Sequence, residues 1–112
     1  MQDKIKVRLA SLKGTASTLA IMRAAEWLRW LEAAARLTFH PPDFITASDE
    51  GEVIFEWLVG SRKLSLWIGE NKAEFLKIWG PNIHTEMEAE DAADQEKILS
   101  AWHWLCAAHE RL

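Results

Sequence analysis

Three side chains near the C-terminus are of types that could do chemistry. His103, Cys106 and His109 recur every third residue, and a thiol beside an imidazole is the arrangement of a nucleophilic thiol enzyme. The same residues are also zinc-ligand types. On a helix, however, this spacing spreads them across roughly 120 degrees, and no nearby Cys-x-x-Cys pair completes four ligands. We therefore expect no catalytic residue, no metal and no cofactor, and keep a small thiol or hydrolytic enzyme using Cys106 with a neighbouring His as the alternative function.

Carboxylates are concentrated between residues 86 and 96. One interpretation is a solvated loop leading into a helix, since acids stabilise the positive end of a helix dipole. The other is an acidic surface that imitates phosphate spacing or docks on a basic protein. The candidate acidic surface comprises Glu86, Glu88, Glu90, Asp91 and Asp94.

Bulk composition narrows the class of protein. The 112 residues carry a net charge of −4, with a basic first third and an acidic remainder, and the pI near 5.5 argues against a nucleic-acid partner. No stretch approaches the roughly 20 apolar residues of a membrane span, so we expect no membrane partner. A single cysteine fits a reducing compartment, and we expect a cytoplasmic protein.

Tryptophan is strongly over-represented, with seven indoles and no tyrosine. A buried aromatic side chain contributes roughly 150–250 Å² of contact, which makes seven more than one small core readily encloses. We therefore expect some indoles to face outward, as in a binding protein.

The apolar pattern predicts one α+β domain over residues 1–112. An amphipathic helix is expected at about 17–37, with Ser17 or Thr18 as its N-cap, and a second at about 91–111. Residues 4–13 fit a short helix or a strand, and Gly14 favours the helix. Strands are expected at about 44–47, 52–59, 62–69 and 73–79. The predicted fold packs the N-terminal and C-terminal helices on one face of an antiparallel sheet of three or four strands.

Strand register decides which side chains reach solvent. Gly60-Ser61 predicts a two-residue hairpin loop with Val59 opposite Arg62. For the next hairpin, a three-residue loop at 70–72 would place Leu76 opposite Leu66 and turn Lys77 outward. The alternative, an even-numbered loop, would bury the Lys77 ammonium, which is costly. We therefore predict the three-residue loop.

In that register the outer face of the sheet is apolar around a pair of charges, as in an interaction surface. The sequence thus predicts a non-enzymatic protein–protein interaction module, and homodimerisation through the same face is equally compatible. The predicted partner-binding residues are Ile54, Glu56, Leu58, Lys63, Trp67, Phe75, Lys77 and Trp79.

The middle of the chain resembles a pattern in small uncharacterised bacterial proteins. It is carried by Pro41-Pro42, by Asp49-Glu50-Gly51, by the Phe55-Glu56-Trp57 strand and by the segment from Gly60 to Leu64, within about residues 16–79. The resemblance implies a helix-plus-antiparallel-sheet fold and brings no catalytic residues. In a small bacterial or phage chain, such a module would be an inhibitor, immunity or antitoxin-like protein, for example one that blocks a defence nuclease.

Overall fold

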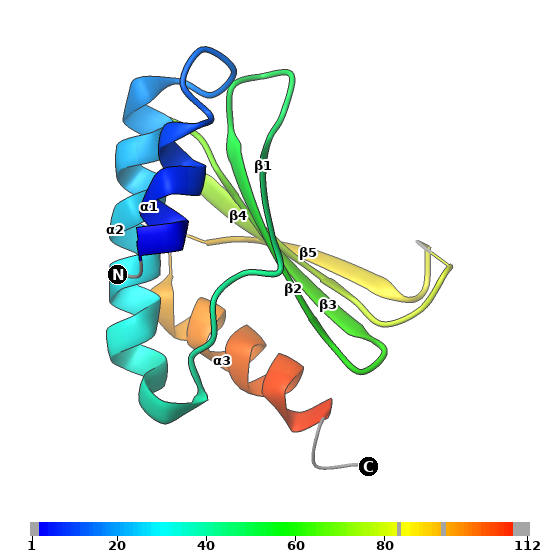
Figure 1. Ribbon diagram of the computed structural model, residues 1–112. Coiled ribbons are helices and arrows are strands. Elements are labelled where there is room, and N and C mark those ends of the chain that lie inside the picture. The colour runs from blue at the N-terminus through cyan, green and yellow to red at the C-terminus, as the bar shows by residue number, and fades with distance from the viewer. Residues whose placement is uncertain (1–2, 83, 93, 109–112) are drawn as a thin grey trace.

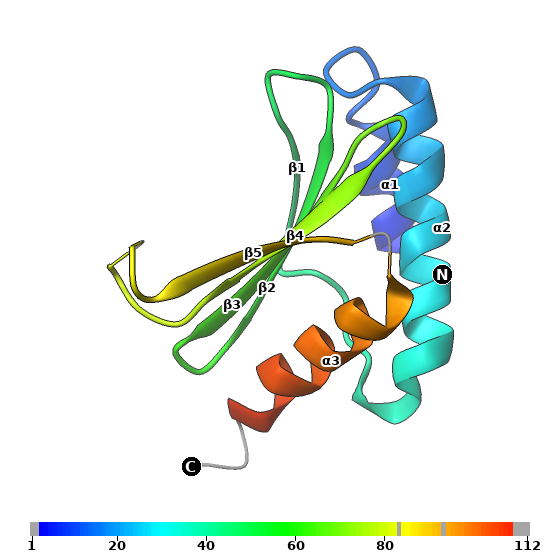
Figure 2. The same cartoon turned by 180° about the vertical axis from the view of Figure 1, so that it is seen from behind.

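The computed structural model describes residues 3–82, 84–92 and 94–108. Helices α1 (Asp3–Ala10), α2 (Thr18–Ala35) and α3 (Gln95–Cys106) lie on one side of a five-stranded antiparallel sheet (Figures 1 and 2). The strands follow chain order: β1 (Phe44–Ala47), β2 (Val53–Val59), β3 (Arg62–Ile68), β4 (Ala73–Ile78) and β5 (Met87–Asp91). This confirms the predicted α+β class, with one strand more than expected. Within the described residues, no helix is long and apolar enough to span a bilayer.

Helices α1 and α2 form where the apolar periodicity places them. The Ser17 hydroxyl caps α2 by accepting a hydrogen bond from the Ala20 N–H at 3.0 Å. The segment that fitted either a helix or a strand is helical, and α1 buries Ile5 and Leu9. The Arg8 Nε donates to the Ile45 carbonyl of β1 at 2.9 Å, so α1 is tied to the edge of the sheet.

The core is centred on two indoles. Trp57 of β2 and Trp102 of α3 are fully buried, and their rings meet edge to face with centroids 5.4 Å apart. Each indole N–H is satisfied: Trp57 donates to the His40 carbonyl at 2.9 Å, and Trp102 donates to the Thr38 hydroxyl at 3.0 Å. Thr38 ends the short 3-10 helix η1 (Arg36–Thr38), so the connection after α2 is joined to the sheet and to α3 by these bonds.

The β2–β3 hairpin has the predicted register. Val59 lies opposite Arg62, and Trp57 lies opposite Leu64. Gly60 adopts a φ of 59°, which favours glycine because it has no Cβ, so the two-residue turn forms here without strain.

The predicted register of the β3–β4 hairpin is wrong. The Gly69 N–H donates to the Lys72 carbonyl at 2.9 Å, which leaves a two-residue turn rather than a three-residue loop. Phe75 therefore lies opposite Leu66 on the helix-covered face, and Lys77 lies opposite Leu64 on that same face.

The physical reason lies at the two ends of β4. Phe75 is 1% exposed, so this register buries a complete aromatic ring. Lys77 lies near the end of the strand, where its ammonium reaches over the Trp104 ring toward Glu88 and its side chain stays 21% exposed. A lysine whose ammonium reaches solvent at the edge of the helix layer avoids most of the desolvation cost of burying a charge.

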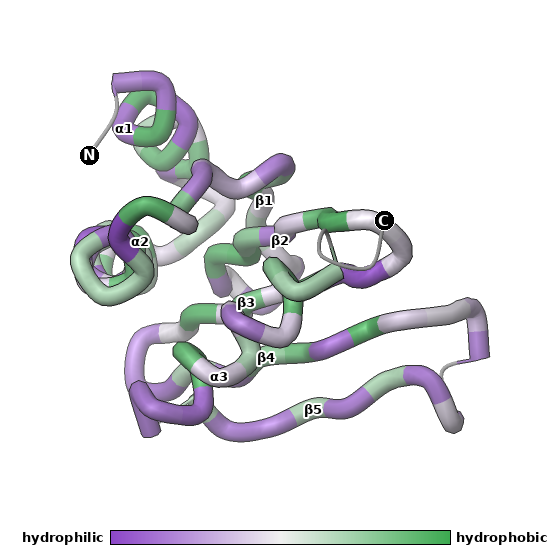
Figure 3. Tube along the Cα trace, turned by 90° about the horizontal axis from the view of Figure 1, so that it is seen from below, coloured by the Kyte–Doolittle hydropathy of each residue, from purple (hydrophilic) through white to green (hydrophobic). Residues whose placement is uncertain are grey.

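The acidic segment contains an unpredicted strand. Met87–Asp91 pairs with β4 as β5, so α3 begins at Gln95 rather than at about residue 91, with Asp94 as its N-cap. Figure 3 shows β5 as a largely hydrophilic edge of the sheet. Charged residues on an edge strand oppose pairing with a strand of another chain.

The register can be tested with two matched substitutions. Phe75→Ala should lower the free energy of unfolding by about 3–5 kcal/mol because it opens a cavity in the core. Phe44→Ala, at a residue that is 53% exposed, should lower it by only about 0.5 kcal/mol. Urea unfolding followed by tryptophan fluorescence measures both values. Equal losses in the two variants would contradict the observed position of Phe75.

Candidate functional site

One face of the sheet is left without a covering helix by the described residues. Helices α1, α2 and α3 all lie on the other side of the sheet (Figure 2). There α2 and α3 contact β2 and β3, and Phe55, Trp57 and Leu64 belong to the core. We call the uncovered side the open face. Strand alternation assigns it these side chains: Phe44, Thr46, Ile54, Glu56, Leu58, Lys63, Ser65, Trp67, Glu74, Leu76, Ile78, Met87, Ala89 and Asp91.

The open face is unusually apolar for a solvated sheet surface. Phe44 and Leu58 are 53% and 49% exposed, although both are large hydrophobic residues. Trp67 and Leu76 lie between them and the β5 edge and are half-buried. A sheet face that meets only water normally carries polar side chains, and this one departs from that pattern.

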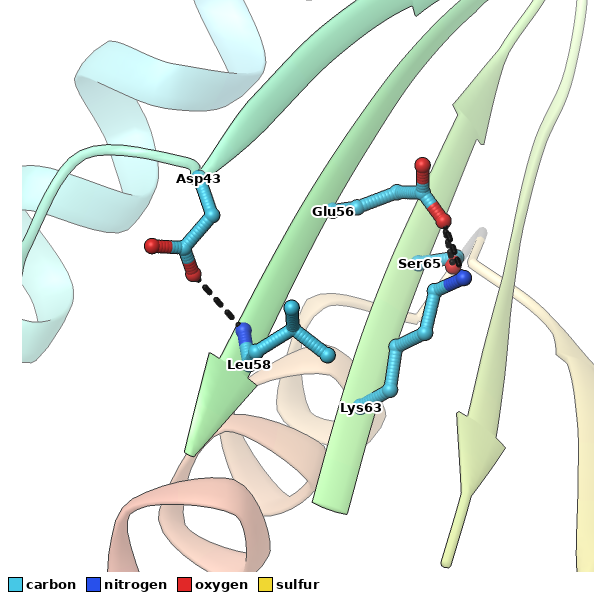
Figure 4. A network of polar contacts seen from close by, with 5 residues as sticks. All are labelled: Asp43, Glu56, Leu58, Lys63 and Ser65. Atoms are coloured by element: carbon cyan, nitrogen blue, oxygen red, sulfur yellow. Dashed lines mark hydrogen bonds and ion pairs between the residues drawn. The ribbon is translucent and has the colours of Figure 1, made fainter. Parts of the chain in front are cut away.

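A small polar network lies at the centre of this face (Figure 4). The Glu56 carboxylate forms an ion pair with the Lys63 ammonium and accepts a hydrogen bond from the Ser65 hydroxyl at 3.4 Å. Glu56 and Lys63 are 21% and 35% exposed, and Ser65 is buried. Beside them, the Asp43 carboxylate accepts the Leu58 backbone N–H at 2.8 Å at the start of β1. The ion pair is therefore partly desolvated and held between two adjacent strands.

The structure brings together part of the predicted contact set. Ile54, Glu56, Leu58, Lys63 and Trp67 lie on the open face as predicted. Their role in binding stays a prediction, because nothing in the geometry tests it.

Phe75, Lys77 and Trp79 do not belong to this surface. Phe75 is in the core, and Lys77 and Trp79 lie on the helix side, where they approach Trp104 of α3. The cause is the two-residue β3–β4 turn, which reverses the phase of β4 relative to the prediction.

Four large apolar members of the open face were not predicted: Phe44, Leu76, Ile78 and Met87. An even-numbered loop before β4 would have assigned Leu76 and Ile78 to the open face from strand alternation alone. Phe44 and Met87 depend on strand pairings that the local sequence does not specify.

The predicted acidic surface is divided among several places. Glu86 accepts the Asn82 N–H at 3.2 Å in the β4–β5 connection, and Glu88 lies 3.8 Å from the Lys77 ammonium. Asp94 accepts the Glu96 N–H at 2.9 Å as the cap of α3. Glu90 pairs with Phe75 on the helix side, whereas Asp91 lies on the open face. The five carboxylates thus do not form one continuous decoy surface.

The open face nevertheless carries net negative charge. Glu74 and Asp91 are directly paired at the β4–β5 end and are both exposed. With Glu56 and Lys63, the face has three acids and one base, a formal charge of −2. Trp67, which pairs with Glu74, has a buried indole N–H without a hydrogen-bond partner in the described part of the chain.

Within the described part of the chain, the residues suited to thiol or metal chemistry are not grouped into a metal site. Burial raises the pKa of the Cys106 thiol, which lowers the fraction of reactive thiolate. His103 is exposed, and His109 lies outside the described residues. Across residues 3–82, 84–92 and 94–108, no group of three His, Cys, Asp or Glu side chains could hold a metal ion.

Comparisons with protein-family models, with curated proteins and with solved structures found no match.

The state of Cys106 gives a direct test of thiol chemistry. Since its pKa is raised, labelling by a thiol reagent at pH 8 should be slower in the native protein than in urea-unfolded protein, and the native rate should keep rising above pH 9. Absorbance after addition of a disulfide reagent measures both rates. Native labelling as fast as unfolded labelling would revive the thiol-enzyme alternative.

Proposed function

We propose that the chain is a non-enzymatic protein-binding module that docks through the open face on a basic partner protein. The observation that carries the proposal is the apolar sheet face, uncovered by described residues, with a half-buried ion pair at its centre and acids at one end. The partner surface would be apolar in the middle and rimmed by lysine or arginine.

The apolar part of the face supplies the binding energy in this proposal. Phe44 and Leu58 already project into solvent, and Trp67 lies on a central strand whose backbone is held on both sides. Rings and branched chains on a rigid sheet lose little conformational entropy when a partner covers them, which is typical of hot spots.

Charge favours a basic partner over a second copy of the chain. Two open faces, each with more acidic than basic side chains, would repel each other, whereas a lysine or arginine opposite the exposed Glu74 would be attracted. The Glu56–Lys63 pair would then set the orientation, because it presents opposite charges at two defined positions.

An acidic module that covers a basic, partly apolar surface competes with nucleic acid for that surface. This supports an inhibitor, immunity or antitoxin-like role for the chain, with a nucleic-acid-binding enzyme such as a defence nuclease as the partner class. The net charge of −4 and the resemblance to small bacterial proteins are in keeping with a cytoplasmic inhibitor in a bacterial or phage setting.

Site-specific photo-crosslinking tests the docking face. A benzophenone amino acid at Leu58 should crosslink one basic protein in cells that naturally express the chain. The same probe at Leu37, which is fully exposed in η1 and off the open face, should not. With the purified partner, Leu58→Glu should weaken binding at least about tenfold, and Leu37→Glu should leave it unchanged. Calorimetry measures both affinities.

Three outcomes would contradict the proposal. They are equal crosslinking from both positions, no adduct from Leu58, and an adduct that proves to be a second copy of the chain. The last would assign the open face to a homodimer. The control is the thermal unfolding midpoint of Leu58→Glu and of Leu37→Glu. Nearly equal midpoints show that weaker binding by Leu58→Glu is not caused by unfolding.

The acidic end of the face should act mainly on the rate of association. Glu74→Gln removes one exposed charge from the open face, so it should slow association by about two- to fivefold at low salt and reduce the dependence of that rate on ionic strength. Glu50→Gln, an exposed carboxylate in the β1–β2 turn, is the matched control. Stopped-flow fluorescence measures the rates, and identical salt slopes in both variants would argue against charge-guided docking.

A further inference from the structure

A second surface lies on the helix side of the sheet, away from the open face. The β2–β3 turn, the end of β4 and the last turn of α3 enclose a cleft of about 610 Å³. We call it the aromatic–cation cleft, and its chemistry comes from Arg62, Lys77, Trp79, Glu88 and Trp104. Its volume falls within the roughly 300–1,000 Å³ of sites that hold small ligands.

Two cations converge on one indole in this cleft. The Arg62 guanidinium carbon lies 5.0 Å, and the Lys77 ammonium 5.2 Å, from the centroid of the Trp104 ring. Arg62 also donates a hydrogen bond from Nη1 to the Trp104 backbone carbonyl. Cation–π contact holds both positive groups at the ring, and the hydrogen bond also fixes Arg62, before any ligand arrives.

A second indole stands next to this stack. The Trp79 ring meets the Trp104 ring at 74° with centroids 6.1 Å apart, and both side chains are half-buried. Trp79 follows β4, whereas Trp104 belongs to α3, so the two indoles come from separate elements that the fold brings together. The Trp79 ring therefore offers an apolar wall beside fixed positive charge.

The positive charge is incompletely neutralised. Among the described residues, no carboxylate is paired with Arg62, and the Lys77–Glu88 pair is loose at 3.8 Å with Glu88 48% exposed. Among the described residues that line the cleft, Arg62 and Lys77 against Glu88 leave a formal +1, in a chain whose net charge is −4. A local positive site in an acidic protein favours an anion, and the free edge of a guanidinium suits an oxyanion.

We propose that the aromatic–cation cleft binds a small ligand that joins an oxyanion to a planar ring. The oxyanion binds Arg62 and Lys77, and the ring packs on Trp79. The oxyanion can be a phosphate, as in a nucleoside monophosphate, or a carboxylate, as in an aromatic acid. This assignment is independent of the docking function of the open face.

Indole N–H signals in ¹H–¹⁵N NMR spectra provide the test, once single Trp→Phe variants have assigned them. Titration with AMP and with benzoate distinguishes the phosphate and carboxylate sources. At least one should shift the Trp79 and Trp104 signals with a Kd of about 1 mM or tighter, while Trp27 and Trp30 on α2 stay unmoved. Adenosine and inorganic phosphate, each half of AMP, should bind at least about tenfold more weakly.

Charge-removing variants locate the ligand. Arg62→Gln should weaken binding about tenfold or more because it removes a charge-assisted contact. Arg29→Gln, at an exposed arginine of α2, should leave the Kd unchanged. Lys77→Gln serves as a second variant if the spectrum of Arg62→Gln loses its native dispersion.

Several results would overturn the assignment. The first is no saturable shift with either probe up to about 10 mM, and the second is an equal shift of all indole signals. The third is that inorganic phosphate binds as tightly as AMP while benzoate does not bind. The fourth is that Arg29→Gln weakens binding as much as the cleft variants do. Saturable shifts confined to Trp79 and Trp104, lost in the Arg62 or Lys77 variant, would confirm it.

Discussion

The hydrogen bond from the Gly69 N–H to the Lys72 carbonyl closes the turn on which both surfaces of this protein depend. A turn longer by one residue would move every side chain of β4 to the other face. With two residues in the turn, Phe75 enters the core, and Leu76 and Ile78 join the open face. The same phase carries Lys77 to Trp104. Burial of the Phe75 ring outweighs the cost of placing a lysine at the rim of the helix side.

Tryptophan serves different purposes in different layers of the molecule. Trp57 and Trp102 form the centre of the core, and both N–H groups have partners there. Trp79 and Trp104 lie at the edge of the helix layer, where positive side chains approach the Trp104 ring. Trp67 is on the open face, and its buried N–H lacks a partner among the described residues. Half-buried indoles on the open face, at the edge of the helix layer and on α2, where Trp27 and Trp30 meet edge to face, explain how a small domain accommodates so many of them.

Local signals predicted the elements whose boundaries depend on nearby residues. Ser17 caps α2, and Gly60 permits the β2–β3 turn, so those elements could be derived from the sequence. β5 could not be, because its Glu, Ala and Asp residues have low strand propensity and pair only once the edge of β4 is available. The phase of β4 could not be derived for another reason: alternation alone does not show that burial on the helix side decreases toward the end of the strand, where Lys77 lies.

The edges of the sheet help to explain why the open face is the better candidate for contact with a partner. On β1, the Ile45 carbonyl is already bound by Arg8 of α1, which occupies an acceptor that an added strand would use. On β5, Glu88, Glu90 and Asp91 place successive charges along the other edge. Both arrangements oppose strand addition. Any contact that uses the sheet would then be made through a face rather than an edge, and the described helices occupy one of the two faces. The apolar open face therefore carries a reduced risk of edge-to-edge aggregation, because both edge strands, β1 and β5, are poorly suited to pairing with a strand of another chain.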